Sequence, residues 1–139
     1  MTVYYANELA PRNTVPVGQV DGSVVNGHVR VHRATITLAS QTTSDTIVVA
    51  LPNIGDSFLY GVITTDTSLG SSTVAIGITG TTAKYKAAAT FTATDTPTLF
   101  GKAAAQTKLT ATETIFITIG AATFPSSGTL VVDLYFSAT

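Results

Sequence analysis

The chain has 139 residues, the length of one ordinary domain, and no cysteine, which excludes disulfides, thiolate catalysis, zinc–thiolate sites and iron–sulfur clusters. Charged residues make up 11% of the chain with a net charge of −1, whereas a typical soluble domain has roughly 25% charged residues. Seven lysines and arginines do not supply the basic face that binding to nucleic acid or to an anionic membrane requires.

Threonine takes the place of charge, with 27 copies in the chain. Its β-branched side chain favours extended backbone over helix. A surface of Thr, Ser and Ala is polar enough to be wet, yet it costs little to desolvate when a partner covers it. The composition is equally consistent with an ordinary neutral β surface.

Residues 1–27 are predicted to form an extended N-terminal arm, because Pro11, Pro16 and three glycines interrupt any regular element apart from one short edge strand at 17–20. The start of the chain does not have the charged and then apolar pattern of a signal peptide. No window reaches the roughly 18 apolar residues of a membrane span. The sequence therefore predicts synthesis in the cytoplasm without an obvious export signal.

From residue 28 onward the pattern is one of strands and turns. In the first strand, 28–38, Val29 and Val31 share one parity while Ile36 and Leu38 share the other, so we expect a bulge near 32–33. Alternation or short apolar runs predict further strands at 46–51, 57–65, 73–79, 114–119 and 129–136. Residues 84–94 are expected to hold one or two more strands, and 100–108, FGKAAAQTK, at most a helical turn.

The parity of each strand predicts which side chains face the core. In 57–65 we expect Phe58, Tyr60 and Val62 on one side, with Leu59 and Ile63 on the other. Gly77, inside its strand, predicts a bend or a close approach of another backbone. The remaining inward sets are Val74, Ile76 and Ile78; Ile115, Ile117 and Ile119; and Leu130, Val132, Leu134 and Phe136.

Seven or eight short strands, turn signals about every ten residues and no useful helix predict an all-β sandwich or barrel. A jelly-roll-like β-sandwich of about eight strands is the commonest solution at this size, and we place it at residues 28–139, after the arm. An immunoglobulin-like sandwich is the alternative, but the cysteines and tryptophan typical of that fold are missing.

The sequence contains no catalytic or metal-binding signature, so we expect a non-enzymatic protein without cofactor. His28 and His32 alternate with Arg30 and are interpreted as part of an exposed, mildly basic strand face. Asp45, Asp56, Asp66 and Asp95 are interpreted as turn residues, with a calcium-binding loop as the alternative for Asp56 and Asp66. A cupin-type metalloenzyme would need more histidines than these two.

Three segments together resemble the small head decoration or cement proteins of tailed bacteriophages, of the kind found in Bordetella-type short-tailed phages. They are ALPNIGDSFLYGVITT (50–65), KYKAAATFTATDTPTLFG (84–101) and TIFITIGAATFPSSGTLVVDLYF (114–136). The resemblance implies a jelly-roll-like domain that oligomerises on the outside of the capsid and bridges neighbouring major capsid protein subunits. It supplies no catalytic residues.

The expected function is therefore that of a virion structural protein, made in the host cytoplasm and placed on the capsid surface. Its expected partners are the major capsid protein and further copies of itself, as a dimer or trimer. The apolar arm is the candidate interface, with Tyr4, Tyr5, Leu9 and Arg12 as its contact residues. The alternative is a carbohydrate-binding β-sandwich of a phage fibre or adhesin, with Tyr60, Tyr85 or Tyr135 stacking on sugars.

Overall fold

The computed structural model describes residues 27–138, which form eight β-strands and one short 3-10 turn, η2. No helix among these residues is long and apolar enough to cross a membrane. The elements are β1 (His28–Thr37), β2 (Thr46–Ala50), β3 (Ser57–Thr65), β4 (Thr73–Ile78), β5 (Thr81–Thr90), β6 (Thr98–Phe100), η2 (Ala103–Ala105), β7 (Ile115–Gly120) and β8 (Thr129–Ala138).

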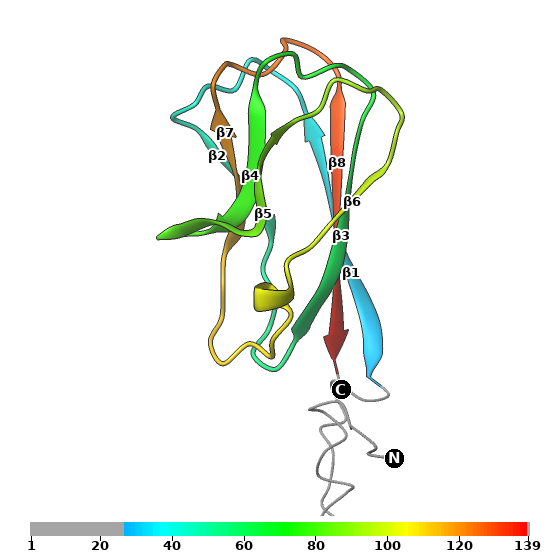
Figure 1. The fold of residues 1–139 in the computed structure, drawn as a ribbon, viewed down its shortest axis with the longest axis vertical. Coiled ribbons are helices and arrows are strands. Elements are labelled where there is room, and N and C mark those ends of the chain that lie inside the picture. Colours follow the sequence, from blue (N-terminus) through cyan, green and yellow to red (C-terminus); the bar gives the residue numbers. More distant parts are fainter. Residues whose placement is uncertain (1–26, 139) are drawn as a thin grey trace, which may run out of the picture.

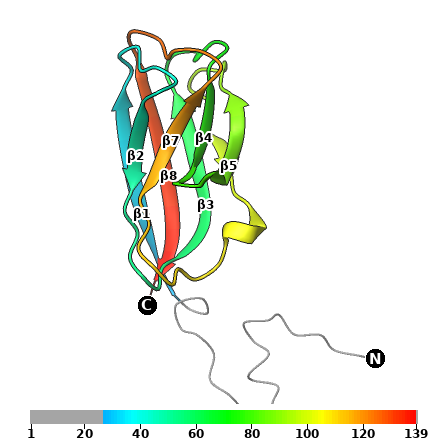
Figure 2. The ribbon, with the colours of Figure 1, turned by 90° about the vertical axis from the view of Figure 1, so that its left-hand side faces the viewer.

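The strands form two antiparallel sheets of four, in the orders β1-β8-β3-β6 and β2-β7-β4-β5. Figure 1 shows the sheets facing each other, and Figure 2 shows the β2-β7-β4-β5 sheet from its outer side. Consecutive strands cross from one sheet to the other except at the β4–β5 hairpin. Eight antiparallel strands connected in this way form a jelly roll, which confirms the predicted fold class.

The core between the sheets is built from the inward-facing residues of both sheets, which alternate with outward-facing residues along the strands. The predicted inner faces of β4, β7 and β8 are confirmed: every member is fully buried except Ile78, which packs against the core from a half-buried position. Phe58 is the centre of an aromatic cluster, with its ring centroid 4.7 Å from that of Tyr85, 5.6 Å from Phe136 and 6.5 Å from Phe100. This cluster joins β3, β5, β6 and β8 across the sandwich.

The first strand differs from the prediction in its inner face. β1 pairs with β8 without any register shift, so the bulge expected near 32–33 is wrong. The even-numbered side faces the core, with His32 half-buried against Phe136. Val29 and Val31 therefore stay on the outer face, where they are 61% and 53% exposed.

A bulge lies instead in β3, where the pairing with β8 shifts between Phe58 and Tyr60. One extra residue reverses the parity of a strand, so Phe58 and Ile63 are both buried although they differ in parity. The prediction that Phe58, Tyr60 and Val62 share one face is wrong, and so is the expected burial of Tyr60, which is 41% exposed.

The β4–β5 hairpin confirms the close approach of backbone predicted at Gly77. Ile78 pairs with Thr81, so only Thr79 and Gly80 form the turn, and Gly80 has a positive φ of 83°. Gly77 is the close-approach position: a Cβ built there would lie under 3.0 Å from backbone atoms of Thr81 and Thr82. The predicted helical turn in 100–108 is confirmed by η2.

Asp66 joins the end of β3 to the start of β8. Its Oδ1 accepts the backbone N–H of Thr129 at 2.7 Å and the hydroxyl of Thr67 at 2.9 Å. These hydrogen bonds, that of Thr129 first, favour the charged form and lower the pKa of Asp66 below its ordinary value of 3.8. The stabilisation is therefore complete above the pKa of the unfolded chain and is lost as the pH falls through the lower, folded pKa.

We expect Asp66→Asn to lose stability at neutral pH and to show a flatter acid limb, between about pH 5 and pH 2, in a plot of urea midpoint against pH. Asp95→Asn is the matched control, because the Asp95 carboxylate accepts no hydrogen bond from the described residues and asparagine tolerates its positive φ of 52°. An acid limb of unchanged slope in Asp66→Asn would contradict the role assigned to this carboxylate.

Candidate interaction surface

The two histidines of β1 lie in different environments. His28 is exposed at the start of β1, whereas the His32 ring lies edge-on to Phe136 with the centroids 5.4 Å apart. The prediction of an exposed basic face is therefore wrong for His32, although His28 and Arg30 are exposed. Within residues 27–138 no group of three or more His, Asp or Glu side chains is placed to hold a metal ion.

The turn role predicted for the aspartates is confirmed where their carboxylates accept backbone hydrogen bonds. Asp45 accepts the N–H of Thr42 at 2.8 Å, and Asp56 accepts that of Asn53 at 3.1 Å. Asp66 does the same for the first residue of β8. Asp56 precedes β3 and Asp66 follows it, so the two carboxylates considered for calcium lie at opposite ends of that strand.

The three tyrosines considered for sugar stacking occupy two different environments. Tyr85 is fully buried, and its hydroxyl donates to Glu113, which also pairs with Lys84. Burial, and second the hydrogen bond to Glu113, raise the pKa of the Tyr85 phenol. Tyr85 is thus a core residue, whereas Tyr60 and Tyr135 stack on each other outside the core, with centroids 4.6 Å apart and an angle of 15° between the rings.

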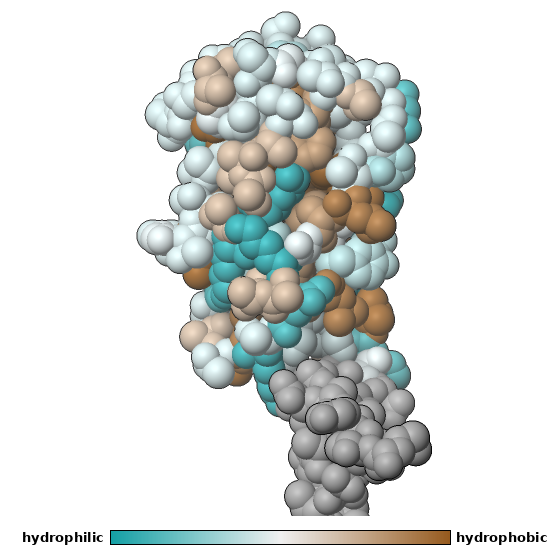
Figure 3. All heavy atoms as spheres, viewed as in Figure 1, coloured by the Kyte–Doolittle hydropathy of each residue, from teal (hydrophilic) through white to brown (hydrophobic). Residues whose placement is uncertain are grey.

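The outer side of the β1-β8-β3-β6 sheet carries a row of apolar side chains across all four strands. Register places Val31 opposite Tyr135, Tyr135 opposite Tyr60, and Val62 opposite Leu99. Leu99 is 70% exposed. In Figure 3 brown side chains lie at the right-hand edge, over this sheet. We call this surface the outer apolar face; it consists of Val29, Val31, Tyr60, Val62, Leu99, Val131 and Tyr135.

A single ion pair lies within the outer apolar face. Arg33 and Asp133 are opposite each other in register, with Nε–Oδ1 at 2.8 Å and the second guanidinium nitrogen 2.9 Å from Oδ2. The hydrogen bond to Asp133, and then its charge, raise the pKa of Arg33. Because the pair is bidentate and internally neutral, a partner can cover this face without leaving an uncompensated charge.

The sequence contains apolar residues on the outer sides of β1 and β8, although the alternation pattern did not predict an outer apolar face. Val29 and Val31 on β1, and Val131 and Tyr135 on β8, are apolar residues on the side opposite the inner set. Strands that are apolar on both sides predict a second covered surface as well as a core. The predicted interface residues Tyr4, Tyr5, Leu9 and Arg12 lie outside the described residues, so their role stays a prediction.

The order of the strands in the two facing sheets defines the described domain as a jelly-roll β-sandwich. The sequence matches no protein-family model and no curated protein.

Solved structures share this fold with the chain. A chain of the cyanophage Pam1 capsid asymmetric unit has a TM-score of 0.68 and 18% identity over 81% of this chain and 86% of that one. A chain of the Ralstonia phage GP4 capsid has a TM-score of 0.63 and 16% identity over 81% and 86%. A chain of the acid-stable capsid of Helicobacter pylori bacteriophage KHP30 has a TM-score of 0.59 and 12% identity over 80% and 89%. The fold of this chain is therefore one found in the capsids of three phages.

Proposed function

We propose that this chain is a non-enzymatic structural protein of a phage virion, which binds the outside of the capsid and bridges neighbouring major capsid protein subunits. The observation that carries the proposal is the fold shared with chains of three phage capsids over at least 80% of this chain and 86% of theirs. This breadth of match supports a whole-domain relationship rather than a shared local motif.

The outer apolar face supports the same function. Val29, Val31 and Leu99 are more than half exposed on the outer side of one sheet, and the charges of the described residues among them, Arg33 and Asp133, form an internal pair. Contiguous apolar surface of this kind is typical of sites that a partner covers. Low overall charge fits a protein whose surface is largely occluded in an assembly.

The arm is the second proposed contact. Binding of the segment that bears Tyr4, Tyr5, Leu9 and Arg12 would add apolar area to the contact with a neighbour, and that area would offset the entropy lost on ordering. Association of copies as a dimer or trimer would multiply a weak contact through avidity. The outer apolar face and the arm together would then hold the protein to several capsid subunits at once.

Co-sedimentation with phage heads that lack this protein tests the proposal. We expect the full chain to sediment with the heads, and a chain without residues 1–16 to stay folded but to bind at least about tenfold more weakly, because the arm's apolar contacts are lost. Folding of the truncated chain is checked by its urea midpoint. Unchanged binding by the truncated chain would defeat the arm proposal.

A matched pair of variants addresses the sheet face in the same assay. Leu99→Lys places a charge on the outer apolar face, whereas Val48→Lys places one on the other sheet at a side chain that is 54% exposed. We expect weaker head binding for Leu99→Lys and unchanged binding for Val48→Lys, because a buried, unpaired charge opposes association. A full chain that ignores heads altogether would overturn the proposed function.

A further inference from the structure

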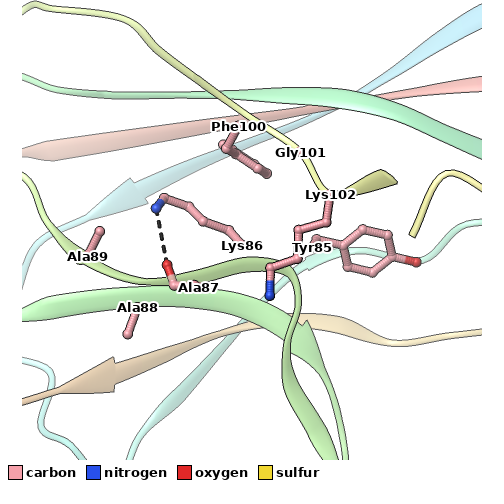
Figure 4. Close-up of a pocket in the computed structure, with 8 residues that line it drawn as sticks. All are labelled: Tyr85, Lys86, Ala87, Ala88, Ala89, Phe100, Gly101 and Lys102. Carbon is pink, nitrogen blue, oxygen red and sulfur yellow. Dashed lines mark hydrogen bonds between the residues drawn. The ribbon is translucent and has the colours of Figure 1, made fainter. Parts of the chain in front are cut away.

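A groove opens between the free edges of the two sheets, where β5 borders one sheet and β6 borders the other. Its main hollow, drawn in Figure 4, has a volume of about 300 Å³. A second hollow of about 270 Å³ shares Lys86 and Ala89 with the first and continues past Phe91 to Thr98. The two hollows are therefore neighbours along the edge strand β5.

The floor of this groove is apolar, and its charge comes from two lysines. Residues 87–89 are three consecutive alanines of β5, and Phe100 lies opposite them. Lys86 extends from β5 toward Phe100, and Lys102 extends from the segment after β6 toward β5 (Figure 4). Figure 3, from the side seen in Figure 1, shows hydrophilic atoms gathered at the centre of the view.

Among residues 27–138, the two lysine charges have no acidic partner in the groove. None of the residues lining either hollow is Asp or Glu, and the nearby Glu113 is already paired with Lys84 and Tyr85. Burial, and second the charge of Lys102, lower the pKa of Lys86 below its ordinary value. A lysine charge on an apolar floor without an acidic partner is costly to desolvate, which favours an anionic ligand.

Both ammonium groups retain donors for such an anion. Lys86 Nζ donates to the carbonyl of Ala87 at 3.1 Å and lies 4.9 Å from the centroid of the Phe91 ring. Lys102 Nζ donates to the carbonyl of Ala83 at 2.6 Å. Because an ammonium has three N–H donors, each lysine can donate further hydrogen bonds to a ligand while it stays anchored.

We propose that this groove binds an extended, acidic segment of a partner protein, with a carboxylate on Lys86 or Lys102 and small apolar side chains against Ala89 and Phe100. β5 is an edge strand, so one side of its backbone has no strand partner within the described part of the chain and can pair with such a segment. Two lysines beside apolar residues suit a peptide carboxylate rather than the many phosphates of a nucleic acid.

This inference rests on the proposed function, because the acidic segment would come from a neighbouring protein of the phage capsid. The test is a titration of the ¹⁵N-labelled full chain, followed by the amide resonances of residues 86–89 and 100–102. The probes are the capped peptide acetyl-Thr-Ala-Glu-Leu-Thr-amide, its Glu-to-Gln counterpart, and inorganic phosphate.

We expect the glutamate peptide to shift these amides saturably and the glutamine peptide to bind about tenfold more weakly, as the loss of a charge-assisted hydrogen bond predicts. The K86Q/K102Q chain should no longer distinguish the two peptides. The R30Q/K108Q chain, which loses the same two charges outside the groove, should distinguish them as the unmodified chain does.

Three results would overturn the inference: no shift at these amides, equal binding of both peptides, or shifts caused by phosphate at lower concentration than by the glutamate peptide. The outcome is independent of head binding. No peptide binding by a chain that sediments with heads overturns this inference alone, whereas peptide binding by a chain that ignores heads overturns the proposed function alone.

Discussion

Phe58→Ala is expected to lower the free energy of unfolding by about 3–5 kcal/mol, as truncation of a buried aromatic residue typically does. Phe58 is 1% exposed and contacts the rings of Tyr85, Phe100 and Phe136, which come from three other strands. Removing its ring leaves a cavity where the two sheets meet. Since whole domains are stable by about 5–15 kcal/mol, this loss takes a large part of the total. Urea unfolding followed by circular dichroism measures it.

Two further variants keep this prediction testable if Phe58→Ala does not fold. Phe58→Leu retains most of the volume and should cost between about 0.5 and 1.5 kcal/mol. Leu99→Ala, at a side chain that is 70% exposed, should change stability by no more than about 0.5 kcal/mol. A Phe58→Leu variant no less stable than the original chain would show that the aromatic cluster does not join the sheets.

Gly77→Ala is expected to destabilise the fold by about 3 kcal/mol or more, through overpacking against backbone rather than against a side chain that can turn away. Its Cβ would lie under 3.0 Å from the Thr81 carbonyl oxygen and from Thr82 backbone atoms. Those atoms belong to β5, which the hairpin holds against β4. The alternative to strain is separation of β5 from the sheet, which hydrogen exchange at residues 81–90 would report.

Gly101→Ala is the matched control for this substitution. The nearest atoms to a Cβ at Gly101 are 3.8 Å away, which is ordinary van der Waals contact. We therefore expect a change within about 0.5 kcal/mol there. Equal unfolding midpoints for the Gly77 and Gly101 variants would mean that β5 moves freely away from Gly77.

The fold class and most strands could be predicted from the sequence because strict alternation survives in the central strands. Ile115, Ile117 and Ile119 on β7 and the inward set of β8 are buried as their parity predicts. Both strands lie between two partners, so their inner faces have only one place to pack. Turn residues such as Gly80, at positive φ, then fix where each strand ends.

Alternation along the strand predicted the wrong inner face where a strand carries apolar residues on both sides. In β1 the change from Val29 and Val31 to the even-numbered set suggested a bulge, although the valines simply lie on the outer apolar face. In β3 the opposite error occurred, because a real bulge between Phe58 and Tyr60 leaves no mark in the residue types. A single sequence gives no means of separating an outer apolar row from a shifted inner one.

The candidate sites could be predicted only in part. The predicted arm residues, Tyr4 among them, lie outside the described residues, whereas the outer apolar face emerges only when register brings β1, β8, β3 and β6 side by side. The groove could not be predicted at all, because Lys86 and Lys102 are separated by 16 positions, and only the packing of the two sheet edges brings them to one pocket.

The place of β8 in its sheet has a consequence for how the chain is made. β8, the last of the described strands to leave the ribosome, lies between β1, the first of them, and β3. Until residues 129–138 have emerged, both of those strands lack a neighbour and the β1-β8-β3-β6 sheet cannot close. Folding of the domain must therefore wait until its translation is complete. On a polysome, neighbouring nascent chains would expose unpaired strand edges to one another and so be prone to aggregate.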